Sequence, residues 1–110
     1  MDIRNVAKRL EALGNATRLS VYRILVRAGA EGLAVGELQR RLDIPASTLS
    51  HHLHRLIGVD LVVQERQSTT LICRANYAAM SETLGFLTDE CCADEGCSVP
   101  VTNRETADAV

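Results

Sequence analysis

The sequence has few aromatic residues and no long apolar run. Tryptophan is absent, and Tyr22, Tyr77 and Phe86 are the only tyrosine and phenylalanine residues among 110. This scarcity weighs against a protein that stacks nucleic-acid bases or encloses a large aromatic cofactor. No apolar run approaches the length of a membrane span, and residues 1–5 lack the apolar segment of a secretory signal. We therefore expect a cytoplasmic protein with no membrane partner.

What is present is typical of a small folded domain. A chain of 110 residues, 46% of them hydrophobic and 24% charged, supplies one core and one domain. Its four cysteines begin only at Cys73. In a reducing compartment, thiols bind ligands or undergo redox chemistry more often than they form disulfides.

Charge is divided along the chain. Through Arg74 there are eleven basic and seven acidic residues, a net charge of +4, whereas the remainder carries −6. A basic body can bind a polyanion even though the whole chain has a net charge of −2. Single domains also show such asymmetry by chance, so charge alone does not identify a partner.

The spacing of apolar residues predicts five helices and one hairpin. Asn15 is a suitable N-cap for the second helix, and Asp43–Pro45 forms a tight connection between the third and fourth. The helices are expected at 3–13, 16–28, 35–42, 46–57 and 77–90, and the strands at 61–65 and 70–74, joined by a polar loop at 66–69. This order, α-α-α-α-β-β-α, is mainly α with a β-hairpin and predicts a winged helix-turn-helix in residues 1–90. Residues 91–110 are expected to form a flexible, acidic, cysteine-bearing tail.

The fourth helix is the first candidate functional element. Leucines account for its buried stripe, and the opposite face carries Ser47, Thr48, Ser50, His51 and Arg55. Hydrogen-bonding side chains near the start of such a helix reach base edges and phosphates in the major groove of DNA. A solvated face, with Ser47 or Thr48 capping the helix, is the structural alternative. The neighbouring helix-turn and hairpin favour DNA binding.

The hairpin loop is the second candidate. Arg66, Gln67 and Ser68 would lie at its tip, where a basic wing contacts phosphates or the minor groove. An ordinary polar loop is the alternative for each of these residues. His51, His52 and His54 point in different directions along one helical turn, so we assign them no metal site, and we expect His52 to pack partly against the core.

The third candidate is a cluster of thiols after the last helix. Cys91, Cys92 and Cys97 fall within seven residues that have no apolar periodicity, so packing does not explain them. Trivalent arsenic or antimony takes three sulfur ligands, whereas structural zinc needs a fourth ligand such as Asp94 or Glu95. Cys73 alternates with Leu71 in a predicted strand and is interpreted as a buried core thiol.

Redox sensing is the alternative for this cluster. Acidic neighbours and the negative end of the preceding helix disfavour ionised thiolates, which peroxide chemistry requires. The same argument weighs against a cysteine enzyme, which needs a positively charged neighbour beside its thiol. We expect no enzyme activity and no organic small-molecule substrate. A protein-interaction module would be distinguished by failure to bind duplex DNA.

Three stretches resemble the ArsR/SmtB family of metal- and metalloid-responsive repressors. They are residues 13–19 (LGNATRL), 35–38 (VGEL) and 47–53 (STLSHHL). The resemblance covers about residues 3–90. It implies a homodimer paired through its first and last helices, which binds an imperfect palindrome in double-stranded operator DNA and is released by its ligand.

The resemblance also implies which sensor type is present. No cysteine stands near residues 33–37, no histidine follows His54, and no cysteine precedes Cys73. Those absences depart from three sensor types of the family. The remaining type, the arsenic-responsive one with C-terminal cysteines, matches Cys91, Cys92 and Cys97. It implies repression of an arsenic-resistance operon, with arsenite as inducer; sensing of antimony(III) or of divalent cadmium, lead or zinc stays open.

Overall fold

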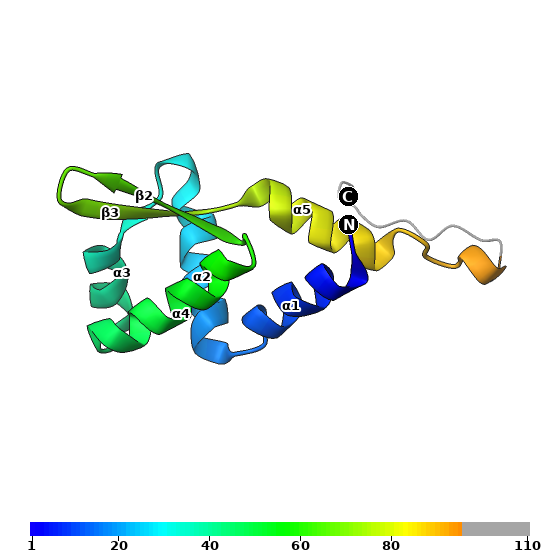
Figure 1. The fold of residues 1–110 in the computed structure, drawn as a ribbon, viewed down its shortest axis with the longest axis horizontal. Coiled ribbons are helices and arrows are strands. Elements are labelled where there is room, and N and C mark those ends of the chain that lie inside the picture. Colours follow the sequence, from blue (N-terminus) through cyan, green and yellow to red (C-terminus); the bar gives the residue numbers. More distant parts are fainter. Residues whose placement is uncertain (96–110) are drawn as a thin grey trace.

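A computed structural model describes residues 1–95 as a winged helix-turn-helix. Four helices precede a β-hairpin, and a fifth helix follows it (Figure 1). The helices are α1 (Ile3–Leu13), α2 (Ala16–Ala28), α3 (Val35–Leu42), α4 (Ala46–Gly58) and α5 (Tyr77–Thr88), and the strands are β1 (Leu33–Ala34), β2 (Val62–Gln67) and β3 (Thr70–Ala75). The predicted order is confirmed, with one additional strand.

The core lies between α2, α3, α4 and the sheet. Its largest fully buried side chains come from all of these elements: Val21, Leu25, Leu38, Leu49, Leu56, Leu61, Val62 and Cys73. The predicted leucine stripe of α4 is confirmed, because Leu49, Leu53 and Leu56 are all buried. Asn15 caps α2 as expected, since its side chain accepts a hydrogen bond from the Arg18 amide.

The sheet has three strands rather than two. Their order is β1-β3-β2, all antiparallel, with Leu33 opposite Cys73. The sequence does not predict β1, because a two-residue strand has no detectable alternation. Gly32 allows this pairing: it has a left-handed φ of 67°, and a Cβ there would collide with the Cys73 carbonyl oxygen.

The hairpin is tighter than predicted. Val62 pairs with Ala75 and Gln67 with Thr70, so only Ser68 and Thr69 form the turn. The expected four-residue loop at 66–69 is therefore wrong: Arg66 and Gln67 belong to β2. Ser68 adopts a left-handed φ of 60°, which lets the chain reverse within two residues.

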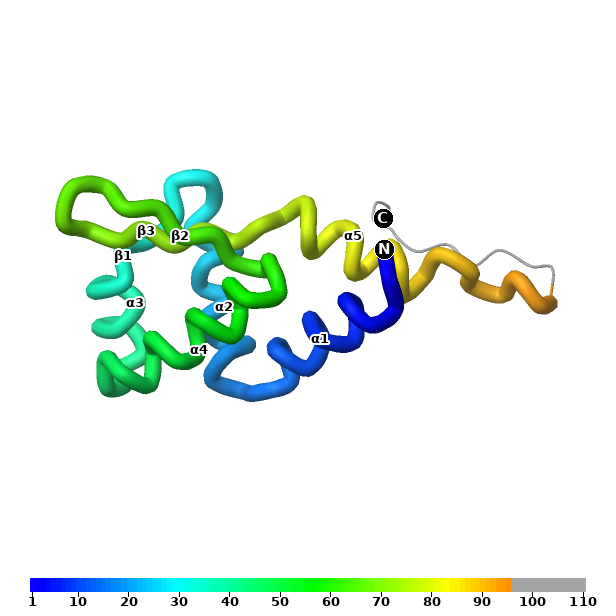
Figure 2. Tube along the Cα trace, viewed as in Figure 1, coloured from blue at the N-terminus to red at the C-terminus, as the bar shows by residue number. Residues whose placement is uncertain are grey.

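A buried arginine attaches α1 to the rest of the fold. Arg9 is only 8% exposed, and its Nε donates to the Val59 carbonyl oxygen after α4 at 3.0 Å. Its Nη1 donates to the carbonyl oxygen of Ala79 and the hydroxyl of Thr83, both in α5, at 3.0 and 3.1 Å. Helices α1 and α5 lie side by side at one end of the molecule (Figure 2).

Helix α5 ends at Thr88, two residues before the expected Glu90. Further turns continue through Cys92, which has a left-handed φ of 60°, to a short 3₁₀ helix at Ala93–Glu95. The part of the predicted tail that begins at residue 96 lies outside the described residues. Across residues 1–95, none of the helices combines the length and apolar character that crossing a bilayer requires.

Replacing Arg9 by Met should destabilise the fold. The substitution keeps an apolar stem but leaves the buried Val59 and Ala79 carbonyl oxygens without the guanidinium, so we expect a loss of about 2–4 kcal/mol in the free energy of unfolding. Urea unfolding at fixed protein concentration measures this loss. Arg4→Met, at an exposed position of the same helix, is the control and should change stability by less than about 0.5 kcal/mol. Equal effects of the two substitutions would contradict the role given to Arg9.

Candidate nucleic-acid interface

The helix-turn-helix consists of α3 and α4. Asp43 ends α3 in a left-handed conformation, with φ 53°, and its amide donates to the Gln39 carbonyl oxygen at 2.8 Å. Pro45 then precedes the first turn of α4, and its carbonyl oxygen accepts from the Leu49 amide. The leucines of α4 are buried in the core on one side of the helix only. The start of α4 therefore lies at the molecular surface on its other side.

The exposed face of α4 carries polar side chains that have no hydrogen-bond or ion-pair partner within residues 1–95. Ser47, Thr48, Ser50, His51 and Arg55 are all exposed, and none of their side chains makes a hydrogen bond or ion pair with the described chain. Pro45, the N-cap residue, supplies no side-chain bond, and neither Ser47 nor Thr48 caps the helix. Capping therefore does not explain these hydroxyls, which remain available to an external partner.

His52 faces the other way and fixes the orientation of α4. It is half-buried, and its Nδ1 lies 3.3 Å from Nη1 of Arg18, which is itself buried. Arg18 Nε also donates to the Ala12 carbonyl oxygen at 2.6 Å. Burial, followed by the nearby Arg18 guanidinium, holds the pKa of His52 below its usual range. A neutral imidazole thus accepts a hydrogen bond from Arg18 and joins α4 to α2. The predicted partial packing of His52 against the core agrees with its half-buried position.

The wing presents Arg66 and Ser68 to solvent. Gln67 is also exposed, although its amide lies 3.5 Å from Oε1 of Glu65 on the same strand. At the base of the wing, Arg74 pairs with Glu65 at 2.6 Å and donates to the Ala30 carbonyl oxygen at 2.8 Å. Of the two arginines of the hairpin, Arg74 is thus occupied within the protein, whereas Arg66 is not.

Two of the three clustered cysteines lie within the described residues. Cys91 is exposed and Cys92 half-buried, and both follow the end of α5, which lies apart from α4 in Figure 1. An open hollow of about 270 Å³ is lined by Cys92 with Glu90, Asp94 and Glu95. Cys97 lies outside the described residues, so the structure does not test the three-thiol site. Cys73 is fully buried, and burial raises the pKa of its thiol, as expected of a core cysteine.

Sequence reasoning missed the two buried arginines, Arg9 and Arg18. Neither is a candidate site residue, but both position elements that carry such residues. Arg18 lies within the LGNATRL stretch, which could have drawn attention to it. For Arg9 the only signal is its place three residues after Val6, on the inward side of α1.

Comparison with known proteins agrees with this geometry. A family model described as a helix-turn-helix domain matches residues 13–65. The nodulation protein NolR of Rhizobium meliloti is 34% identical over 80 residues, 73% of this chain and 63% of the relative; this chain thus spans less than two thirds of that protein.

Solved structures extend the comparison over most of the chain. NolR from Sinorhizobium fredii is 31% identical, with a TM-score of 0.62 over 79% of this chain and 84% of that one. An ArsR-like transcriptional regulator from Rhodococcus sp. RHA1 is 22% identical, with a TM-score of 0.73 over 86% of this chain and 85% of that one, and shows likeness of fold.

Fold and surface together define a winged helix-turn-helix protein of the kind that binds DNA. Within this class, the chain belongs to the ArsR family.

The contact between His52 and Arg18 predicts a pH dependence of stability. Because the pKa of His52 is lowered in the folded state, the unfolded chain binds more protons between that lowered value and the usual 6.5. The free energy of unfolding should therefore fall as the pH drops from about 7.5 to 5.5. In His52→Gln this decrease should be smaller, whereas His54→Gln, at an exposed position of the same helix, should follow the unaltered protein. Urea titrations across this pH range measure both; identical curves for the two variants would exclude His52 as the cause.

Proposed function

We propose that the protein is a homodimeric transcriptional repressor that binds operator DNA and is released by trivalent arsenic. The observation that carries the DNA-binding part is the exposed face of α4, where Ser47, Ser50 and Arg55 lack partners in residues 1–95. Short hydroxyl groups and a guanidinium are suited to base edges and phosphates in a major groove. The wing residues Arg66, Gln67 and Ser68 would contact the flanking backbone.

The dimer is proposed from apolar side chains left uncovered on α1 and α5. Ile3 and Leu10 of α1 are 68% and 41% exposed, and Leu84 and Leu87 of α5 are 56% and 54% exposed. Each belongs to a stripe whose spacing suits packing against another helix. A winged helix-turn-helix domain from Mycobacterium bovis, 22% identical with a TM-score of 0.65, is described as homodimeric. Pairing through α1 and α5 would set two α4 helices about 34–36 Å apart, one turn of DNA.

Replacing Leu87 by Glu tests the dimer. A carboxylate placed in an apolar helix–helix interface is buried without a partner, so we expect the variant to sediment as a monomer at concentrations where the unaltered protein is a dimer. Leu19→Glu, at an exposed position of α2 outside the proposed interface, is the matched control and should remain dimeric. Loss of the dimer in both variants, or in neither, would contradict the assignment to α5.

Arsenic sensing is proposed at Cys91, Cys92 and Cys97. The exposed Cys91 is accessible to a small neutral ligand, and Cys92 lies one residue further on. Arsenous acid would form three S–As bonds with three thiols and release three molecules of water, so no thiolate has to exist beforehand. The hollow around Cys92 is lined by carboxylates, which favours this neutral exchange over thiolate-based redox chemistry. Antimony(III) offers the same chemistry, whereas cadmium, lead or zinc would displace thiol protons.

Release would follow from the attachment of the cysteines to α5. Arg9 joins α5 to both α1 and the Val59 carbonyl oxygen at the end of α4, so a shift of α5 would alter the position of α4, the proposed recognition helix. A dimer altered in this way would no longer match two successive major grooves. Coupling of about 1–3 kcal/mol, typical of allosteric systems, would lower DNA affinity by about 5–150-fold.

The experiment is fluorescence anisotropy on duplex DNA from upstream of the protein's own gene, titrated with arsenite. The unaltered protein should bind and then be released, whereas Cys97→Ser should bind equally well and stay bound. Cys73→Ala, which removes the buried thiol of β3, is the control and should still be released.

Each outcome has a separate meaning. Normal release of Cys97→Ser would exclude Cys97 from the mechanism. Binding that arsenite leaves unchanged, but cadmium, lead or zinc reverses with release of protons, would support the divalent-metal alternative. Failure of the unaltered protein to bind duplex DNA even at low salt would contradict the repressor itself.

A further inference from the structure

The basic side chains divide into those that the protein uses internally and those that it does not. Within residues 1–95, five arginines make hydrogen bonds or ion pairs through their guanidinium groups: Arg9, Arg18, Arg40, Arg41 and Arg74. Six basic side chains make none with the described chain: Arg4, Lys8, Arg23, Arg27, Arg55 and Arg66. The second set is available to an external anion.

Lys8 lies beside the recognition helix although it belongs to α1. Together with His54 and Arg55 of α4, it lines an open hollow of about 300 Å³ between the two helices. One carboxylate, Glu11, shares this hollow, and Asp60 shares a neighbouring one with Lys8. Neither carboxylate forms an ion pair with Lys8. With Lys8 and Arg55 against Glu11, the lining of the hollow keeps a net positive charge.

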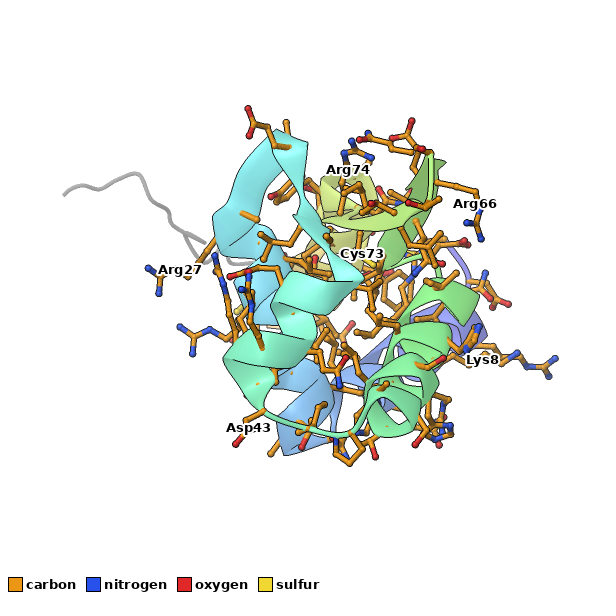
Figure 3. All side chains as sticks on the ribbon, turned by 90° about the vertical axis from the view of Figure 1, so that its left-hand side faces the viewer. Lys8, Arg27, Asp43, Arg66, Cys73 and Arg74 are labelled. Carbon is orange, nitrogen blue, oxygen red and sulfur yellow. The ribbon has the colours of Figure 1, made fainter. Side chains whose placement is uncertain are left out.

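Lys8 also faces the same side of the molecule as the wing. In Figure 3, Lys8 and Arg66 extend to one side, whereas Arg27 extends to the opposite side. Lys8 and the wing therefore present basic groups in one direction, and Lys8 shares its hollow with Arg55 of α4. A duplex bound along α4 carries a negative charge for about every 1.7 Å of its axis, so phosphates lie near any basic group on that side.

Accordingly, we propose that Lys8 of α1 binds a DNA phosphate at the hollow that it shares with Arg55, extending the interface from the wing across α4 onto α1. The inference rests on the proposed DNA-binding function and adds to it a contact outside the helix-turn-helix and the wing. A lysine ammonium is a flexible point charge, suited to a phosphate rather than to two atoms of a base edge. The contact therefore contributes affinity without sequence preference.

Salt dependence of DNA binding tests this contact. Each phosphate contact contributes about 0.9 to the slope of log K against log salt concentration. Lys8→Gln removes one contact per protomer, so in a dimer the slope should become shallower by about 1.8. Fluorescence anisotropy at several KCl concentrations measures the slope, on the duplex from upstream of the gene and on a scrambled duplex. Affinity should fall by the same factor on both.

Arg27→Gln is the matched control, since it removes the same charge from the opposite side and should leave the slope unchanged. Circular dichroism should show both variants folded, because both positions are exposed on helices. If Lys8→Gln keeps the slope of the unaltered protein while Arg55→Gln loses part of it, the Lys8 contact is wrong and the repressor function stands. If the unaltered protein binds neither duplex, both proposals are overturned.

Discussion

The arrangement of this molecule depends on the hydrogen bonds of one buried guanidinium. Arg9 leaves α1 and reaches the Val59 carbonyl oxygen at the end of α4 and, with Nη1, the Ala79 carbonyl oxygen and the Thr83 hydroxyl in α5. Leu10 of α1 and Leu84 and Leu87 of α5 are exposed rather than packed between these helices. The hydrogen bonds of Arg9 thus join the three helices at this end of the fold. The outward leucines remain available for a second copy.

The recognition helix is held in a complementary way on its other side. Leu49, Leu53 and Leu56 bury one stripe of α4, and His52 accepts a hydrogen bond from Arg18 at its edge. Arg18 also binds the end of α1 through the Ala12 carbonyl oxygen. The orientation of α4 is therefore coupled to α1 at two places, through Arg9 and through Arg18. In the proposed mechanism, a change at α5 would be transmitted through this same helix from the proposed thiol site to α4.

Local patterns predicted most of the fold, and long-range contacts account for what they missed. The leucine spacing of α4 and the cap at Asn15 follow from nearby residues, so both appear in the sequence. The local sequence does not predict that Arg9 is buried, because its hydrogen-bond acceptors are carbonyl groups 50 and 70 positions away. Strand β1 is too short for a pattern and exists only because β3 lies beside it. The exposed face of α4 could be predicted from the leucines opposite it; the shared hollow at Lys8 could not, since it requires the packing of α1 on α4.

Net charge is a poor guide to whether this protein binds a polyanion. The chain is acidic overall, with a net charge of −2, yet some of its carboxylates pair with particular arginines. Glu37 pairs with Arg40 and Arg41 on α3, and Glu65 pairs with Arg74 at the base of the wing. Arg74 is thus neutralised locally and the Arg40–Arg41 pair in part, whereas α4 from Ala46 to Gly58 contains no carboxylate. The basic groups that remain without partners on α4 and the wing, rather than the sum over the chain, set the potential that a phosphate meets at short range.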